Sequence, residues 1–260
     1  WSSDLSGSSN PTSLSMTGPK SVTANFSKLQ STPTPSSTPT PSDTTAPANC
    51  SISINSGASY TNSTTVTLTL SATDTVGVTG YYLSTSSSTP SSSASGWTSV
   101  SSTTSYSGSV SYTLTSGDET KTVYVWYKDA AGNVSSTVSD SIILDTTAPI
   151  VTITSPTSGD TYTTTNSTIS LSGSASDSTS GVKEVTWSND KGGSGNASGT
   201  TYWSISSISL SSGDNKITVT AKENAGNSST DTITVTYSTQ TPTPTTTPTT
   251  CTDSYEPNNS

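Results

Sequence analysis

Histidine and arginine are both absent from the 260 residues, and 8 lysines face 17 acidic residues. Without histidine the chain cannot form a Ser-His-Asp triad or an imidazole metal site, and without arginine it cannot make bidentate contacts to phosphate. The net charge of −9 also disfavours nucleic acid and anionic membranes as partners. We therefore expect no nucleic-acid binding, and we predict that the segment is not an enzyme.

Large apolar residues are scarce as well. Leu, Ile, Val and Phe together number 37, whereas Ser and Thr number 118. That apolar share lies below the roughly 20% at which disorder is expected, but the high charge that accompanies disorder is missing. No apolar run approaches the ~18 residues of a membrane span, so we expect no membrane insertion. The Ser/Thr-rich, lysine-poor composition is typical of secreted or cell-surface chains and predicts an extracellular location.

Two Thr/Pro-rich tracts, 31–42 and 239–250, divide the chain. Repeated Thr-Pro favours polyproline II, which acts as a semi-rigid spacer, and such tracts often carry O-linked glycans. They separate a first piece (1–30), a middle block (43–238) and a last piece (251–260). Because the chain starts at Trp1 without an initiator methionine, we expect it to be a segment of a longer protein.

The middle block is an internal repeat. Four short motifs recur in order: Asp43–Pro47 as Asp145–Pro149, Val76–Val78 as Ser180–Val182, Ser116–Asp118 as Ser212–Asp214, and Asp129–Asn133 as Glu223–Asn227. The period is about 100 residues, which is the length of an immunoglobulin-like sandwich. The repeat predicts two domains, 43–144 and 145–238.

Alternation of apolar residues with threonine predicts strands in both units. In the second unit the predicted strands are 150–154, 168–174, 182–188, 202–210, 216–222 and 231–237. Ile217, Val219 and Ala221 should face a core that also includes Trp187 and Trp203, while the intervening threonines suit the solvent face. The predicted fold class is all-β, with two tandem immunoglobulin-like antiparallel β-sandwiches joined to their surroundings by Thr/Pro-rich linkers.

These motifs resemble those of tandem bacterial immunoglobulin-like repeats over 43–238. The first unit departs from the pattern through Cys50 and a Ser-rich insert around 86–95. Residues 1–30 resemble the tail of a divergent internalin-type repeat, and 251–260 resemble the start of a bacterial pre-peptidase C-terminal domain. The resemblance implies a large modular extracellular protein in which such repeats space, adhere or form fibres and do not catalyse.

Two groups of acidic residues are candidate Ca²⁺ ligands. In an immunoglobulin-like sandwich the domain start, the second–third strand loop and the last hairpin share one end. The predicted groups are Asp43, Asp74 and Asp129 in the first unit, and Asp145, Asp177 and Glu223 in the second. Ca²⁺ prefers six to eight oxygen ligands, several of them carboxylate. The alternative is that these acids only cap turns.

An aromatic face is the second candidate site. Aligning the units at their Gly-Asn pairs sets Tyr82, Tyr124 and Trp126 against threonines of the second unit. Exposed aromatic clusters usually mark interfaces, and a flat aromatic platform could also stack on sugar rings. The alternative is that these rings pack against the Ser-rich insert.

Cys50 and Cys251 each follow a Thr/Pro tract. Two stacked sandwiches span on the order of 80 Å, whereas the second tract reaches only about 37 Å. We predict that the cysteines do not pair within one chain, because a disulfide needs a short Cα separation. Each could pair with a neighbouring chain or a further domain, or Cys50 could stay buried and reduced.

The leading functional hypothesis is a non-catalytic structural segment of an extracellular fibre, stalk or adhesin. Its expected partners are neighbouring copies or other domains of the same surface protein. Two alternatives remain: an accessory region of a secreted hydrolase, and a glycan-binding module that uses the aromatic face. Ca²⁺ is the one expected cofactor.

Overall fold

The computed structural model describes residues 17–18 and 42–239. The internalin-like and pre-peptidase-like resemblances, nearly all of both Thr/Pro tracts, and Cys251 lie outside the described residues.

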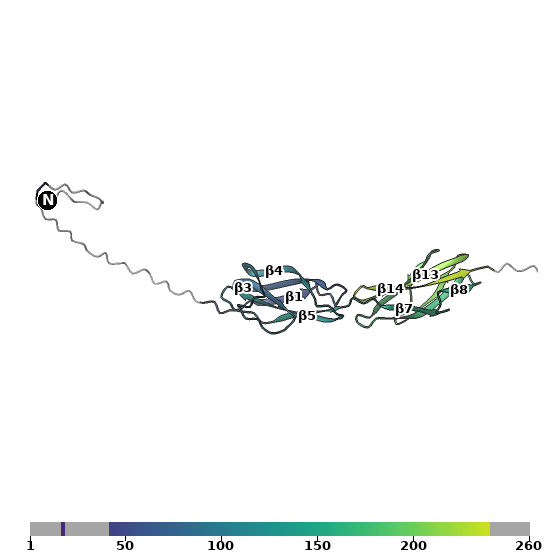
Figure 1. The fold of residues 1–260 in the computed structure, drawn as a ribbon, viewed down its shortest axis with the longest axis horizontal. Coiled ribbons are helices and arrows are strands. Elements are labelled where there is room, and N and C mark those ends of the chain that lie inside the picture. The colour runs from purple at the N-terminus through teal and green to yellow at the C-terminus, as the bar shows by residue number, and fades with distance from the viewer. Residues whose placement is uncertain (1–16, 19–41, 240–260) are drawn as a thin grey trace, which may run out of the picture. The chain divides into compact units, whose positions relative to one another are not determined.

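All regular structure in the described part of the chain is β-strand, which confirms the predicted fold class (Figure 1). The first sandwich contains β1 (Ala48–Ile54), β2 (Tyr60–Thr61), β3 (Thr65–Ser84), β4 (Trp97–Thr113), β5 (Glu119–Asp129) and β6 (Val138–Leu144). The second contains β7 (Ile150–Ser155), β8 (Thr161–Thr164), β9 (Thr168–Ser176), β10 (Val182–Asn189), β11 (Ser194–Asn196), β12 (Tyr202–Ser209), β13 (Gly213–Glu223) and β14 (Ser228–Tyr237). The described residues include no helix that could cross a membrane.

A single long strand links the two layers of the first sandwich. The first part of β3 pairs with β1, and its last part, from Val78 onward, pairs with β5. β4 follows β3 as an antiparallel partner along most of its length. The change of partner occurs next to Gly77, whose φ of 133° lies in a region that side chains rarely adopt. This conformation explains why a glycine stands in the middle of Val76–Val78, and Gly181 holds the same place in the second copy of the motif, with a φ of 78°.

The second sandwich consists of two separate sheets, β11-β10-β13-β14-β8 and β12-β9-β7. The six predicted strands are all present, with ends that differ by a few residues. The sequence analysis did not predict β8 or β11. The predicted antiparallel pairing needs a correction at two edges, because β8 runs parallel to β14 and β2 runs parallel to β6.

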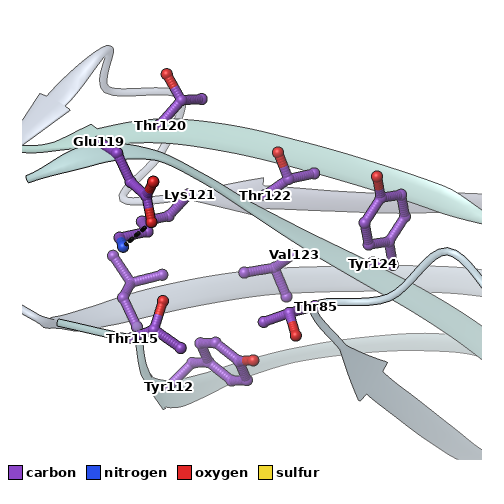
Figure 2. Close-up of a pocket in the computed structure, with 10 residues that line it drawn as sticks. Thr85, Tyr112, Thr115, Glu119, Thr120, Lys121, Thr122, Val123 and Tyr124 are labelled. Carbon is purple, nitrogen blue, oxygen red and sulfur yellow. Dashed lines mark hydrogen bonds and ion pairs between the residues drawn. The ribbon is translucent and has the colours of Figure 1, made fainter. Parts of the chain in front are cut away.

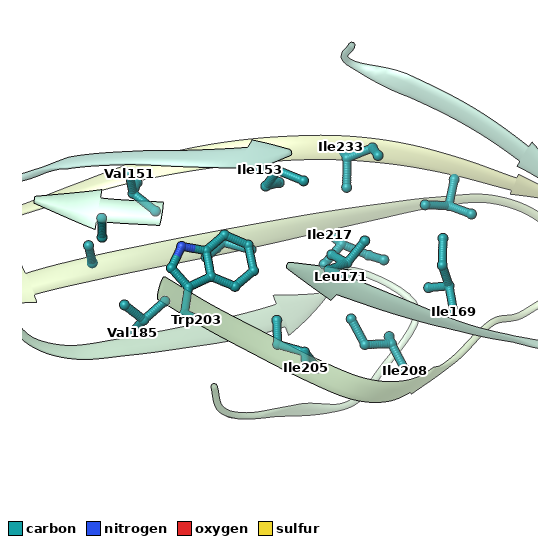
Figure 3. Packing of buried hydrophobic residues seen from close by; sticks show 14 of the residues in the cluster. Val151, Ile153, Ile169, Leu171, Val185, Trp203, Ile205, Ile208, Ile217 and Ile233 are labelled. Atoms are coloured by element: carbon teal, nitrogen blue, oxygen red, sulfur yellow. The ribbon is translucent and has the colours of Figure 1, made fainter. Parts of the chain in front are cut away.

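Each sandwich has its own apolar core. In the second, Trp203 is buried among branched aliphatic side chains from both sheets (Figure 3). Ile217, Val219 and Ala221 are fully buried, as their alternation predicts, and Trp187 packs partly buried against the same cluster. Few large apolar residues are needed because the sandwich is thin and threonine forms much of its outer surface.

Candidate metal centres and aromatic face

Two triads of carboxylates converge in the described part of the chain. One consists of Asp43, Asp74 and Asp129, and the other of Asp145, Asp177 and Glu223. In each triad, one carboxylate oxygen per residue lies within 4.8 Å of the others. These are the two groupings that the repeat predicts, and each residue comes from the corresponding place in its unit.

In the first triad, each carboxylate uses one oxygen to shape its own turn. Asp74 Oδ1 accepts hydrogen bonds from the backbone N–H groups of Val76 and Gly77, at 2.9 and 2.7 Å. Asp43 Oδ1 accepts one from the N–H of Thr45. This much agrees with the turn-capping alternative.

The turn-capping alternative does not account for the second carboxylate oxygen of Asp43 or of Asp74. Both Oδ2 atoms are buried and have no hydrogen-bond partner among the described residues. Asp74 as a whole is only 7% exposed. A buried, unpaired carboxylate oxygen costs free energy unless a proton or a cation satisfies it. The turn-capping role explains one oxygen of each residue and leaves the second unexplained.

The asparagine of the Ala-Gly-Asn hairpin links two members of each triad by hydrogen bonds, a role that the sequence analysis did not predict. The Asn133 side-chain amide donates to Asp129 Oδ2 at 2.6 Å and to the Asp43 backbone carbonyl at 3.1 Å. In the second unit, the Asn227 amide donates in the same way to the Asp145 carbonyl at 2.8 Å. The recurrence of this asparagine in both units was the available sequence signal.

In the second triad, Asp145 and Glu223 are fully buried. Asp177 Oδ1 accepts the backbone N–H groups of Ser180 and Gly181, at 2.9 and 2.8 Å. Glu223 accepts the Ser180 hydroxyl and the Asn227 N–H. This triad has more hydrogen bonds than the first, but every donor to it is a neutral group.

No lysine compensates either triad. Among the described residues the one ion pair joins Lys121 to Glu119, which belong to neither group. Two carboxylate charges 4.8 Å apart repel by about 3.5 kcal/mol at an effective dielectric constant of 20. Carboxylate and backbone carbonyl oxygens are hard donors that suit Ca²⁺. The residues present therefore fit a divalent cation.

The aromatic residues form a cross-strand row on the outer face of the first sandwich. Tyr82 pairs with Trp97 on one side and with Trp126 on the other. The equivalent position of the second sandwich is Thr186, which pairs with Asn196 and Thr220. The register thus matches the alignment by which the three aromatic residues were selected.

The expectation that this row is exposed needs a correction for Trp126, which is fully buried. Tyr82 and Tyr124 lie beside it, with ring centroids 6.2 and 6.3 Å away. The Ser-rich insert is tied to the same face, since Trp97 Nε1 donates to the Ser91 carbonyl at 2.9 Å and Lys128 Nζ to the Ser92 carbonyl at 3.0 Å. A flat platform that includes Trp126 is therefore not available, whereas Tyr82 and Tyr124 remain partly exposed.

Cys50 is partly buried beside the first core and forms no disulfide within the part of the chain that the structure describes. Burial raises its pKa above the ordinary value, although a hydrogen bond with Ser135 opposes this effect. That Cys50 does not pair with Cys251 within one chain stays a prediction, because Cys251 lies outside the described residues.

Comparison with known proteins bears on the second sandwich. Residues 149–239 match the family model described as glucodextranase, domain B. The sandwiches are immunoglobulin-like. A comparison with curated proteins gives no match.

Solved structures with a similar chain course include fibronectin(III)-like modules of CbhA from Clostridium thermocellum. They share 14% identity at a TM-score of 0.40, over 72% of this chain and 94% of theirs. The D00–D0 domain of intimin shares 12% identity at a TM-score of 0.33, over 72% and 98%. Dimeric latent PorU from Porphyromonas gingivalis shares 13% identity at a TM-score of 0.30, over 73% and 24%.

Proposed function

We propose that this chain is a non-catalytic structural segment of an extracellular fibre, stalk or adhesin, in which a bound Ca²⁺ stabilises one end of each sandwich. The observation that carries the proposal is the first triad, where two buried carboxylate oxygens have no hydrogen-bond partner within residues 42–239. The partners of such a segment are neighbouring copies or other domains of the same surface protein.

The placement of the triads lets a bound cation stabilise the fold of each sandwich. Each triad joins the residue that opens a unit and the last hairpin of that unit to a third segment, which is the bend inside β3 in the first sandwich and the turn between β9 and β10 in the second. A divalent ion held by all three would link segments far apart in the sequence. It would thereby stabilise the folded state by mass action, since the unfolded chain has no such site.

A second candidate function is supported by the family match. Glucodextranase is named for a hydrolase, and the matching model describes one of its domains, domain B. This favours an accessory region of a secreted hydrolase, in which the sandwiches would be carried beside a catalytic domain. Both candidates share the extracellular location and the absence of catalysis in this segment.

Calorimetric melts of the full chain in chelator and in millimolar Ca²⁺ test the proposal. We expect Ca²⁺ to raise the melting temperature, and Asp74→Asn to remove the part of that rise that belongs to the first sandwich. Asp160→Asn provides the matched control, because it removes one charge at an exposed position outside both triads. Equal melting temperatures with and without Ca²⁺ would refute the cation sites.

A further inference from the structure

A groove in the first sandwich lies apart from the carboxylate triads. It has a volume of about 310 Å³, which is within the lower range of small-ligand sites. It runs along the first half of β5 and is closed on one side by the end of β4. Its lining residues are Thr85, Tyr112, Leu114, Thr115, Glu119, Thr120, Lys121, Thr122, Val123 and Tyr124.

The groove exists because β3 ends early. β3 pairs with β5 only from Ser84 opposite Tyr124 onward, whereas β6 pairs with β5 from Glu119. Residues 119–123 therefore have a strand partner on one side alone. At about 3.3 Å per residue, this stretch makes the groove roughly 16 Å long from Glu119 to Tyr124, which is longer than one sugar ring.

The two ends of the groove differ in chemistry, as Figure 2 shows, with the Lys121–Glu119 pair at one end and Tyr124 at the other. Lys121 is 5% exposed, and its ammonium donates to Glu119 Oε1 at 2.6 Å and to the Ser116 carbonyl at 3.1 Å. An ammonium has three donors. One donor of Lys121 thus has no partner among the described residues, beside an exposed carboxylate that can accept.

The aromatic end is held in place. The Tyr124 ring stacks on Trp126 with an interplanar angle of 28°, so its orientation is fixed by packing. Tyr112 comes from β4, and its hydroxyl is protonated at neutral pH, since partial burial raises a pKa that is already well above neutrality. Leu114 and Val123, which belong to the buried core of the first sandwich, lie behind the polar residues of the groove.

These features select one class of ligand. An anion is disfavoured, because acidic residues outnumber Lys121 and Lys128 in the first sandwich and the Lys121 charge is already paired. A purely apolar ligand would give no partner to the third donor of Lys121 and would remove water from the exposed carboxylate of Glu119. A neutral polyol has both apolar C–H faces and hydroxyls. We propose that this groove binds a neutral oligosaccharide, with a sugar ring on Tyr124 and hydroxyls held by Lys121 and Glu119.

Backbone amide NMR of the full chain tests this proposal. The probes are linear trisaccharides of glucose, galactose, mannose and N-acetylglucosamine, together with an acidic galacturonic acid trisaccharide. We expect saturable shifts at the amides of Thr120, Thr122 and Tyr124 with at least one neutral probe, and weaker binding of the acidic one. No shift with any neutral probe at millimolar concentration would overturn the proposal, and so would preferential binding of the acidic probe.

Variants separate a binding role from a structural one. Tyr124→Ala should weaken binding by about tenfold, or ~1.4 kcal/mol, whereas Tyr124→Phe should retain it because the ring persists. Glu119→Gln should weaken binding without unfolding the domain, since this side chain is 68% exposed. Tyr202→Ala, an exposed tyrosine of the second sandwich, is the control. Unchanged affinity in both Tyr124→Ala and Glu119→Gln would contradict the proposal. The cation sites have no part in this test.

Discussion

Replacing Asp74 by asparagine should stabilise the Ca²⁺-free protein and abolish the Ca²⁺ response of the first sandwich. In the triad, Asp74 faces Asp43 and Asp129, with one oxygen of each residue within 4.8 Å of the others. Asparagine keeps an oxygen that can accept from the N–H groups of Val76 and Gly77. Its new amide donor can take the place of the unpaired Asp74 Oδ2.

The size of the effect follows from the charges. Each of the two repulsions that disappear is on the order of 3.5 kcal/mol for charges 4.8 Å apart at an effective dielectric constant of 20, and the hydrogen bonds that the carboxylates accept offset part of it. If only ~1 kcal/mol survives, the melting temperature of a domain of this size rises by about 4–8 °C.

Differential scanning calorimetry in chelator and in Ca²⁺ measures both parts of this prediction. The order of the melting temperatures of the first sandwich should reverse between the two conditions. In chelator Asp74→Asn should melt higher than the wild type, whereas in Ca²⁺ it should melt lower, because the variant gains nothing from Ca²⁺ in its first sandwich. If Asp74→Asn instead lowers the melting temperature equally in both conditions, the carboxylate only caps its turn and the electrostatic reasoning is wrong.

Three further predictions concern other parts of the fold. Trp203→Ala should destabilise the second sandwich by about 3–5 kcal/mol. Calorimetry should show no change in the melting temperature of the first sandwich, since the two cores are separate. Hydrogen bonds from the Thr147 hydroxyl and the Thr146 amide hold the pKa of Asp118 below its ordinary value. These hydrogen bonds should therefore persist at neutral pH and be lost as the pH falls through the lowered pKa. The NMR chemical shift of the Thr146 amide should titrate at that pKa in the wild type and should not titrate in Asp118→Asn. Because burial raises the pKa of Cys50, a Cys251→Ser variant should react with iodoacetamide more slowly when folded than in urea, and equal rates would contradict its placement.

The repeat in the sequence was sufficient to predict the triads, because three recurring motifs mark the three segments that meet at one end of a sandwich. It was also sufficient for the core, since the alternation of Ile217, Val219 and Ala221 has the period of a strand. β8 was not predictable in this way, because Thr161–Thr164 shows no apolar alternation and joins the sheet at an edge, parallel to β14.

The burial of Trp126 shows a different limit. The pattern placed this residue on the outer face, next to Tyr82, and the strand register agrees. The rings of Tyr82 and Tyr124 lie beside it, and the Ser-rich insert is tied to the neighbouring residues Trp97 and Lys128, although its composition indicates a loop without showing where that loop lies. Contacts such as the one from Lys128 to the Ser92 carbonyl depend on tertiary structure and have no local sequence signal. The groove beside Tyr124 has the same origin, since it depends on where β3 ends.

Anomalous scattering from crystals grown in Ca²⁺ tests the central claim most directly. The account predicts a difference peak within bonding distance of Asp43, Asp74 and Asp129, and a second peak among Asp145, Asp177 and Glu223. Well-ordered carboxylates in both triads with no anomalous peak between them would contradict it.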